Sequence, residues 1–298
     1  MITTAPEPIE AAPATPGGRV WRRFRANKIG MVAMAMVIVL AVVAITFFIL
    51  DLFGIPFPMD PDATNLERKL LPPNAVNWLG TDNLGRDVLS RLLNGAYISL
   101  TVGFVAVFVS LFIGVVVGAL AGYFGKWVDN LIMRAVDALM CFPTFFLILT
   151  AVALLGPSIF NIIFVIGLVS WTGTARLVRA EFLTLRESSY VQAARALGQR
   201  GWKIIFRHIL PNSLAPIIVA ATLGVANAIL SEAYISFLGF GVRQPTATWG
   251  NMLEDANRYL ESAPQLWIFP GFLILFTVLS INFLGDGLRD ALDPRMRI

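Results

Sequence analysis

Charged and amide side chains inside the long apolar segments are the residues of this sequence most able to do chemistry. Glu232 lies near one end of an apolar segment, and a charge at the centre of a membrane helix costs about 2.5–3.5 kcal/mol and usually serves a function. Asp137 follows Arg134 by three residues, so we expect an ion pair between them, with gating as the alternative. Asn227 is suited to hydrogen bonds between helices. Glu232, Asn227 and Asp137 are therefore candidates for a polar translocation path or for contact with another subunit. A carboxylate snorkelling to the interface is the alternative for Glu232.

The chain lacks the residue groups that catalysis or a metal centre requires. A phosphate-binding loop needs Gly, four residues, Gly-Lys and then Ser or Thr. Here Gly125-Lys126 is followed by Trp127, and the upstream glycine is missing. One histidine, His208, and one cysteine, Cys141, give no cluster of metal ligands. We expect no catalytic activity, no metal and no cofactor in this chain, so any energy it uses would have to come from a partner or an ion gradient.

Composition and hydropathy place the chain in a membrane. Hydrophobic residues make up 57% of the 298 positions and charged residues 14%, with a mean hydropathy of +0.73. Soluble domains carry roughly 25% charged residues. Apolar runs of about 20 residues without alternation predict spanning helices rather than a barrel. The expected fold is all-α and integral to the membrane, with six transmembrane helices at residues 29–50, 97–122, 135–155, 158–178, 213–238 and 265–286.

Glycine and proline predict how the third and fourth spans are arranged. Residues 138–175 carry no charge and are too long for one helix across a bilayer. Gly156-Pro157-Ser158 is a turn signal near their middle and predicts a tight hairpin. Pro143 predicts a kink within the third span.

The distribution of lysine and arginine predicts the orientation of the spans. Basic residues gather in four stretches, at 19–28, 126–134, 176–207 and 289–297. The loops on the other side hold Arg68, Lys69, Arg86, Arg91, Arg243 and Arg258. Because cytoplasmic loops are enriched in these residues, both termini and a loop at 181–212 are expected in the cytoplasm, and segment 51–96 outside it. Basic residues at a membrane face also account for the net charge of +4 without nucleic-acid binding.

The rest of the domain organisation follows from local composition. Residues 1–18 are rich in Pro, Ala and Thr and are expected to form a disordered tail, and residues 19–298 a single transmembrane domain. On the external side, the apolar residues of 84–93 share one helical face, which predicts an interfacial helix with an ion pair between Asp87 and Arg91. Around residues 249–267, aromatic side chains predict a membrane anchor or a contact surface for an external partner.

The stretch from Ser188 to Asn212 is too polar for lipid, although apolar segments flank it. Tyr190, Ala193, Ala194 and Leu197 repeat with helical spacing, and so do Trp202, Ile205, Phe206 and Ile209. Gly198 separates the two stripes, and Pro211 is expected to end the second helix. The pattern predicts two short amphipathic helices. They either dock a partner or pack on their own bundle as a solvated loop.

The spacing within this stretch resembles the cytoplasmic signature loop of permease subunits of bacterial ABC importers. That motif reads EAA, three residues, Gly, nine residues, and I-x-LP. This chain has Gln192-Ala193-Ala194, then Gly198, then Leu210-Pro211, with Gln192 in place of the glutamate and His208 in place of the isoleucine. The segments RRFRANK, LGTDNLGRDVLSRLLNGA, AVDALMCFP and SEAYISFLGFG are similar to the second-permease branch of the dipeptide/oligopeptide family.

The resemblance implies a type I importer permease fold in a bacterial inner membrane, with coupling helices between helices 4 and 5. It implies four partner subunits: a homologous permease, two cytoplasmic ATPases that bind ATP and Mg, and an extracytoplasmic substrate-binding protein. The residues it assigns to ATPase coupling are Tyr190, Gln192, Ala193, Ala194, Leu197, Gly198, Trp202, Ile205, Phe206, Leu210 and Pro211. Short peptides are the expected cargo. The alternatives are nickel or another small solute, an ion-coupled secondary carrier, and a scaffold that only recruits a cytoplasmic partner.

Overall fold

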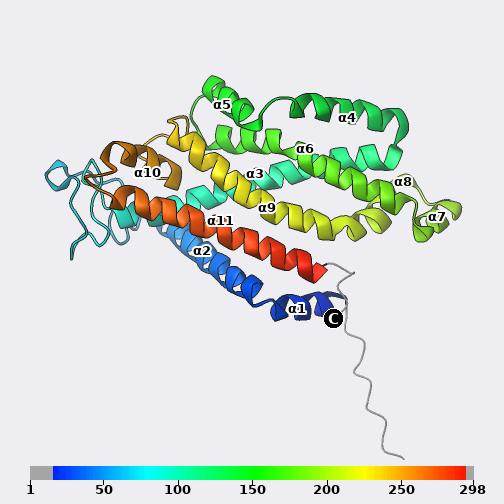
Figure 1. The fold of residues 1–298 in the computed structure, drawn as a ribbon, viewed down its shortest axis with the longest axis horizontal. Helices are drawn as coiled ribbons and strands as arrows, with labels where there is room; N and C mark the ends of the chain where they lie inside the picture. Colours follow the sequence, from blue (N-terminus) through cyan, green and yellow to red (C-terminus); the bar gives the residue numbers. More distant parts are fainter. Residues whose placement is uncertain (1–15, 293–298) are drawn as a thin grey trace, which may run out of the picture.

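The computed structural model describes residues 16–292, which form an elongated bundle of helices (Figure 1). The α-helices are α1 (Pro16–Ala26), α2 (Lys28–Leu52), α3 (Val88–Phe124), α4 (Lys126–Met140), α5 (Thr144–Leu155), α6 (Ile159–Arg186), α7 (Ser189–Ala196), α8 (Gly201–Ile204), α9 (Leu210–Phe237), α10 (Trp249–Ala256) and α11 (Gln265–Leu292). A π turn, Ile205–Ile209, joins α8 to α9, and 3-10 turns lie at Leu66–Arg68 and Asn257–Tyr259. The all-helical prediction is confirmed for the described residues.

The long helices run along the length of the bundle, which has two different ends (Figure 1). Helices α2 and α11 lie along one side and α4 and α5 along the other, with α3, α6 and α9 between them. One end carries α7, α8 and α1, and we call it the α7–α8 end. The opposite end carries α10 and the loop that follows α2, and we call it the α10 end.

Five helical segments are long and apolar enough to cross a membrane: α2, α3, α6, residues 201–237 and α11. The third predicted span, at 135–155, differs from expectation. Helix α4 begins at Lys126 rather than at 135, and α4 and α5 meet at a bend of 81° instead of forming one kinked helix. Pro143 lacks an N–H and disfavours helical geometry in the residue before it, so the helix breaks at residues 141–143. The hairpin at Gly156 is confirmed, with a φ of +86° between α5 and α6.

Several other predicted boundaries need correction. Pro211 does not end a helix, because the preceding π turn lets the N–H of Leu210 reach the carbonyl of Ile205 and the helix continues into α9. The helix expected at residues 84–93 leads into the second span as predicted, but it forms the first turns of α3 from Val88 rather than a separate interfacial helix. Of the predicted disordered tail, residues 16–18 belong to α1 and residues 1–15 lie outside the described part of the chain.

Glycines allow α3 and α6 to pack closely along their whole contact. Gly114, Gly118 and Gly122 lie one turn apart on α3 and face α6. A Cβ atom on Gly118 would lie 2.5 Å from the carbonyl oxygen of Ala175, and one on Gly122 would lie 2.5 Å from the Cβ of Phe182. Small residues of this kind let membrane helices approach until their backbones touch.

This packing predicts that Gly118→Ala destabilises the bundle. Because a backbone carbonyl occupies the position of the added methyl, the helices must separate, and overpacking of this kind costs about 1–3 kcal/mol. Thermal unfolding of the detergent-solubilised protein measures the effect. The control is Gly173→Ala on α6, where a Cβ meets nothing within 4 Å and alanine favours the helix. Equal melting temperatures for the two variants would contradict the close contact.

Candidate functional site

The loop between α6 and α9, residues 187–209, folds back against its own bundle. Val191 and Ala194 of α7 are buried, and so are Ile204, Ile205 and Ile209. They form one apolar cluster with Ala119 of α3 and with Val178 and Phe182 of α6. The loop is therefore packed against the ends of two long helices, α3 and α6.

Gly198 gives this loop its sharp turn. The residue has a φ of +73°, and an added Cβ would meet nothing within 4 Å, so the backbone conformation alone favours glycine here. Its N–H donates to the carbonyl of Arg195, and the N–H of Gln199 donates to the carbonyl of Ala194, at 3.0 and 3.1 Å. This pair of bonds is a Schellman motif, which ends α7 and satisfies its last carbonyl groups.

The two residues that depart from the family motif both make hydrogen bonds within the loop. Gln192 donates from Nε2 to the carbonyl oxygen of Glu187 at 3.0 Å. His208 Nε2 lies 2.9 Å from Oε1 of Gln199, which joins the π turn to the end of α7. Neither residue forms an ion pair, so these contacts hold the shape of the loop and need no acidic side chain.

The outward surface of the loop combines apolar and basic side chains. Tyr190, Leu197, Trp202 and Phe206 are exposed, Leu197 by 81% and Trp202 by 65%. The rings of Trp202 and Phe206 stack with their centroids 6.0 Å apart. Exposed basic residues stand among them, namely Arg195, Arg200, Lys203 and Arg207. We call these eight residues the docking surface, because monomeric proteins rarely leave apolar groups of this size together in water.

The two apolar stripes predicted from the sequence do not each form a single face. Ala194 and Ile205 point into the bundle, whereas Leu197 and Phe206 from the same stripes point outward. The prediction assumed α-helical spacing throughout, but α7 is only 8 residues long and the π turn changes the register after α8. Of the other predicted coupling residues, Ala193 and Pro211 are exposed and Leu210 is partly buried.

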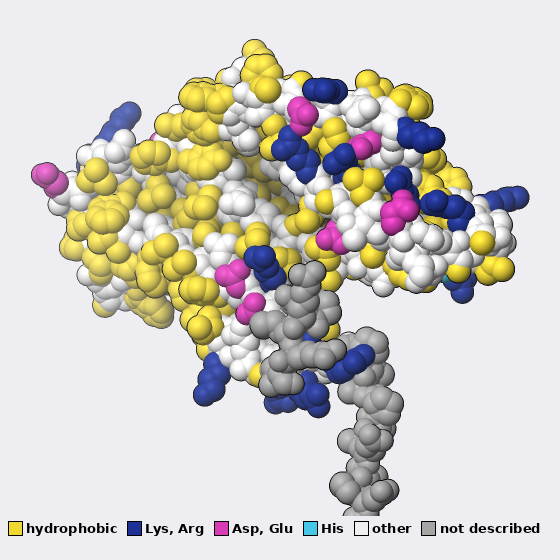
Figure 2. Space-filling view, turned by 45° about the vertical axis from the view of Figure 1, so that its right-hand side comes forward, with side chains coloured by type: hydrophobic (Ala, Val, Ile, Leu, Met, Phe, Trp, Pro, Cys, Tyr) yellow, Lys and Arg dark blue, Asp and Glu magenta, His cyan; other side chains and the backbone are white. Residues whose placement is uncertain are grey.

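Basic side chains are also distributed unevenly over the molecule. In Figure 2, Lys and Arg side chains gather over the α7–α8 end and near α1, while hydrophobic side chains cover most of the remaining visible face. A band of apolar surface with basic residues at one end is typical of a protein that spans a membrane.

A cavity of about 460 Å³ opens halfway along the bundle, on the side formed by α3, α5, α6 and α9. Its polar lining is made of hydroxyl groups and one amide: Ser110, Thr144, Ser170, Thr172, Thr174, Asn227, Ser231 and Tyr234. Alanine, valine, leucine, isoleucine, methionine and glycine supply the rest, and no charged side chain lines it. Asn227 was singled out in the sequence and is exposed here. The hydroxyl groups were missed, although Ser170 and Thr174 stand one helical turn apart in a charge-free segment.

Glu232 is enclosed by the chain's own helices rather than exposed to a partner or a solute. Its side chain is fully buried and accepts hydrogen bonds from Ser236 at 2.7 Å and from Ser99 at 3.4 Å. Ser99 in turn accepts from the N–H of Trp249, so the cluster joins α3, α9 and α10. Neither interpretation of Glu232 from the sequence describes this arrangement, because both require the carboxylate to reach a surface.

Asp137 also has a different partner from the one expected. It pairs with Arg176 of α6 rather than with Arg134 of its own helix, and Asp129 pairs with Arg179. Both pairs join α4 to α6. The side chains of Asp137 and Arg176 are about half exposed, and such pairs contribute about 0–1 kcal/mol.

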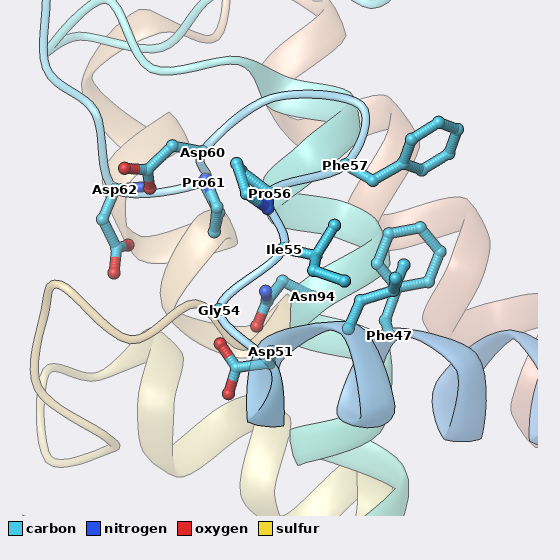
Figure 3. Close-up of a pocket in the computed structure, with 11 residues that line it drawn as sticks. Phe47, Asp51, Gly54, Ile55, Pro56, Phe57, Asp60, Pro61, Asp62 and Asn94 are labelled. Atoms are coloured by element: carbon cyan, nitrogen blue, oxygen red, sulfur yellow. The ribbon is translucent and has the colours of Figure 1, made fainter.

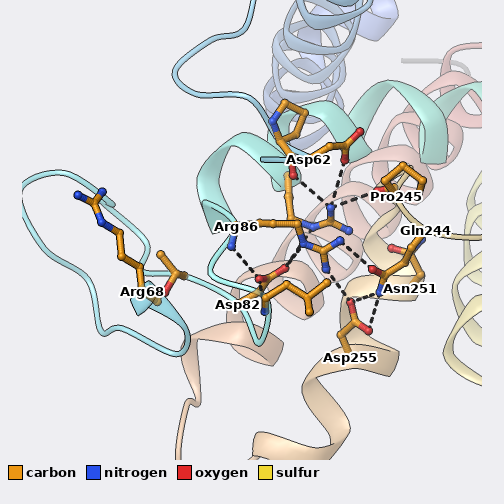
Figure 4. A network of polar contacts seen from close by, with 12 residues as sticks. Asp62, Arg68, Asp82, Arg86, Gln244, Pro245, Asn251 and Asp255 are labelled. Carbon is orange, nitrogen blue, oxygen red and sulfur yellow. Dashed lines mark hydrogen bonds and ion pairs between the residues drawn. The ribbon is translucent and has the colours of Figure 1, made fainter. Parts of the chain in front are cut away.

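At the α10 end, two buried arginines join loops that lie far apart in the sequence (Figure 4). Arg86 contacts Oδ2 of Asp82 at 2.6 Å, Oε1 of Gln244 at 2.7 Å and Oδ2 of Asp255 at 3.5 Å. Arg91 donates to the carbonyl oxygen of Pro245 at 3.2 Å. Burial raises the pKa of Asp255 above its ordinary value, while Arg86 opposes the shift. The predicted pair of Arg91 with Asp87 is absent, because Asp87 caps α3 and accepts from the N–H of Ser90.

A smaller pocket of about 250 Å³ lies beside this network, where α2 ends (Figure 3). Carboxylates from the loop after α2 stand on one side of it and apolar side chains, among them Phe47 and Phe57, on the other. Asp62 contacts Arg91 at 3.5 Å, and burial raises the pKa of Asp62 above its ordinary value. Asp62 thus belongs both to the lining of this pocket and to the arginine network, and it connects the network to the pocket where α2 ends.

An all-helical spanning bundle with a neutral polar cavity and an apolar, basic loop at one end defines a membrane transport component. Comparison with known proteins identifies the family. Residues 114–298 match the model of the binding-protein-dependent transport system inner membrane component, and residues 15–73 match the N-terminal transmembrane domain of oligopeptide transport permease C. The chain belongs to this family of ABC importer permeases, within its peptide-permease C-type branch, and is a multi-pass inner membrane protein.

Two relatives are similar along almost their whole length. The dipeptide transport system permease protein DppC of Alkalihalophilus pseudofirmus is 42% identical, covering 98% of this chain and 96% of DppC. The glutathione transport system permease protein GsiD of Pectobacterium atrosepticum is 39% identical, covering 100% of this chain and 97% of GsiD. The inward-facing methionine ABC transporter MetNI shares the fold, with a TM-score of 0.55 and 20% identity, covering 69% of this chain and 98% of that one. These relationships do not favour an ion-coupled carrier.

Proposed function

We propose that this chain is one of two permease subunits in an ATP-driven importer of short peptides, and that it lines half of the translocation path. Relatives named for the transport of dipeptides and of glutathione support peptides as the cargo. The lining of the cavity supports them over nickel, because it contains no carboxylate, imidazole or thiolate, the ligands that bind divalent metals most readily.

The observation that carries this proposal is the contrast between two faces of the bundle. On α2 the exposed side chains are mostly apolar, among them Ile38, Val42 and Ile45. Around the cavity, by contrast, Ser170 and Asn227 are exposed. Unpaired amides and hydroxyls are costly against hydrocarbon. The α2 face therefore meets lipid, and the cavity face meets the second permease and the solute that passes between the two subunits.

The docking surface is the proposed contact with a cytoplasmic ATPase, and the α7–α8 end is then the cytoplasmic end. In this arrangement ATP and Mg²⁺ bind to the ATPase subunits and this chain binds neither. Closure of the ATPases pushes on the loop, which moves the ends of α3 and α6. The α10 end faces the external side and receives the substrate-binding protein.

Purification of a tagged chain in mild detergent tests the composition. We expect a second permease and two ATPase copies to accompany each copy of this chain. We also expect ATP hydrolysis by the complex to rise several-fold when the peptide-loaded binding protein is added. Isolation of the chain alone under conditions that keep other importers assembled would contradict the proposal.

A further inference from the structure

We propose that the cavity between α3, α5, α6 and α9 holds the carboxylate end of the peptide during its passage. This inference rests on the proposed function and adds to it a recognition site within the permease. A path formed only by a gap between subunits would need no specific groups from this chain. The cavity provides such groups from two separate elements.

The first element is the break between α4 and α5. Thr144, the first residue of α5, and Met140, the last residue of α4, both line the cavity. The break therefore opens at the cavity wall, and α5 starts there. The first N–H groups of a helix have no intrahelical acceptors, and Pro143 provides no side-chain cap for them. Free N–H groups and the positive end of the helix dipole favour an anion at this position.

The second element is Ser110 on α3. Its side chain is only 5% exposed and lines the cavity, and no acceptor or donor among the described residues pairs with its hydroxyl group. Its hydroxyl oxygen is not among the fully enclosed polar atoms that lack a partner, so it is accessible from the cavity. With no hydrogen bond inside the bundle, the hydroxyl group is free to bond a ligand there.

The remaining lining narrows the class of ligand. No charged side chain lines the cavity, so the cavity provides no counter-charge for a cationic solute. Ser170, Thr174 and Asn227 offer further donors and acceptors, which suit peptide amides. Aliphatic residues such as Val107 and Ile166 line the cavity between them. The site therefore recognises what all short peptides share, a terminal carboxylate and a backbone, and does not discriminate between peptide side chains.

The test is Ser110→Ala in the complete transporter, reconstituted in liposomes with its binding protein and ATP. Uptake is measured for a dipeptide with a free carboxylate and for the same dipeptide as its C-terminal amide. A hydrogen bond to a charged group predicts a loss of about tenfold for the free acid, and less than twofold for the amide. Because the binding protein is the same in every assay, its own preference cancels when the two variants are compared.

Thr277→Val is the matched control, because Thr277 is a buried hydroxyl without a hydrogen-bond partner on α11 that does not line the cavity. We expect it to leave the ratio of acid to amide uptake unchanged. Equal losses for both peptides in Ser110→Ala, or no loss for either, would overturn the carboxylate site while the transporter still works. Absence of peptide uptake by the unaltered complex would instead overturn the proposed function.

Discussion

Trp202→Ala is expected to release the ATPase subunits from the purified complex while the chain itself stays folded. Trp202 is 65% exposed and stacks on Phe206 in the docking surface. Truncation of a central aromatic anchor typically costs an interface about 2 kcal/mol or more, which corresponds to roughly a thirtyfold loss of affinity. Because the side chain makes little contact with its own bundle, the melting temperature of the chain should hardly change. Co-purification and peptide uptake should fall together.

Trp127→Ala provides the control for this experiment. Trp127 is 72% exposed at the start of α4, outside the docking surface. Its truncation removes the same side chain from a different exposed surface and should leave the complex assembled. If Trp202→Ala kept its ATPases and its transport rate, the loop would be only a solvated connection between α6 and α9.

Arg86→Met is expected to give the largest loss of stability. Arg86 is 1% exposed, and its guanidinium contacts Asp82, Gln244 and Asp255. Its removal leaves two buried or half-buried carboxylates without their main counter-charge, and breaking a buried ion pair in this way costs about 3–5 kcal/mol. Thermal unfolding in detergent measures the loss. We also expect reduced stimulation by the binding protein, because the network positions the loops of the α10 end, where the binding protein is proposed to dock.

Arg68→Met is the matched control for Arg86→Met. Arg68 lies in the same loop between α2 and α3 but is exposed, and exposed charges contribute about 0–1 kcal/mol. The melting temperature of the Arg68→Met variant should match that of the unaltered protein. If Arg86→Met and Arg68→Met had the same melting temperature, the network would not hold the α10 end together.

The sequence predicted the helical fold well because long apolar runs leave the chain few alternatives. The hairpin at Gly156 followed from a turn signal of glycine and proline within such a run. Breaks inside helices were harder to predict. Pro143 produced a bend of 81° where a mild kink was expected, and Pro211 was accommodated by a π turn. A single proline has the same local cost in both cases, and packing against neighbouring helices decides the outcome.

The candidate site was predicted unevenly for a similar reason. The sequence predicted a break at Gly198 within the loop, because a turn at glycine leaves a local signal. Which side chains of the loop face outward and which face the bundle depends on contacts with α3 and α6. These contacts cannot be inferred from the sequence of the loop. Ser110 was missed because one serine in an apolar run carries no signal until four helices enclose it. Glu232 gave a strong signal, but its hydrogen-bond partners come from segments more than 100 residues away and from its own helix.

Peptide uptake by the reconstituted transporter is the measurement that tests the central claim most directly. Liposomes that contain this chain, its partner permease and the ATPase subunits are supplied with peptide-loaded binding protein outside and ATP inside. We predict that peptide accumulates inside only when the ATP and the binding protein are both present, and that Trp202→Ala abolishes the accumulation. Uptake by this chain alone, driven by an ion gradient and independent of ATP, would contradict the account.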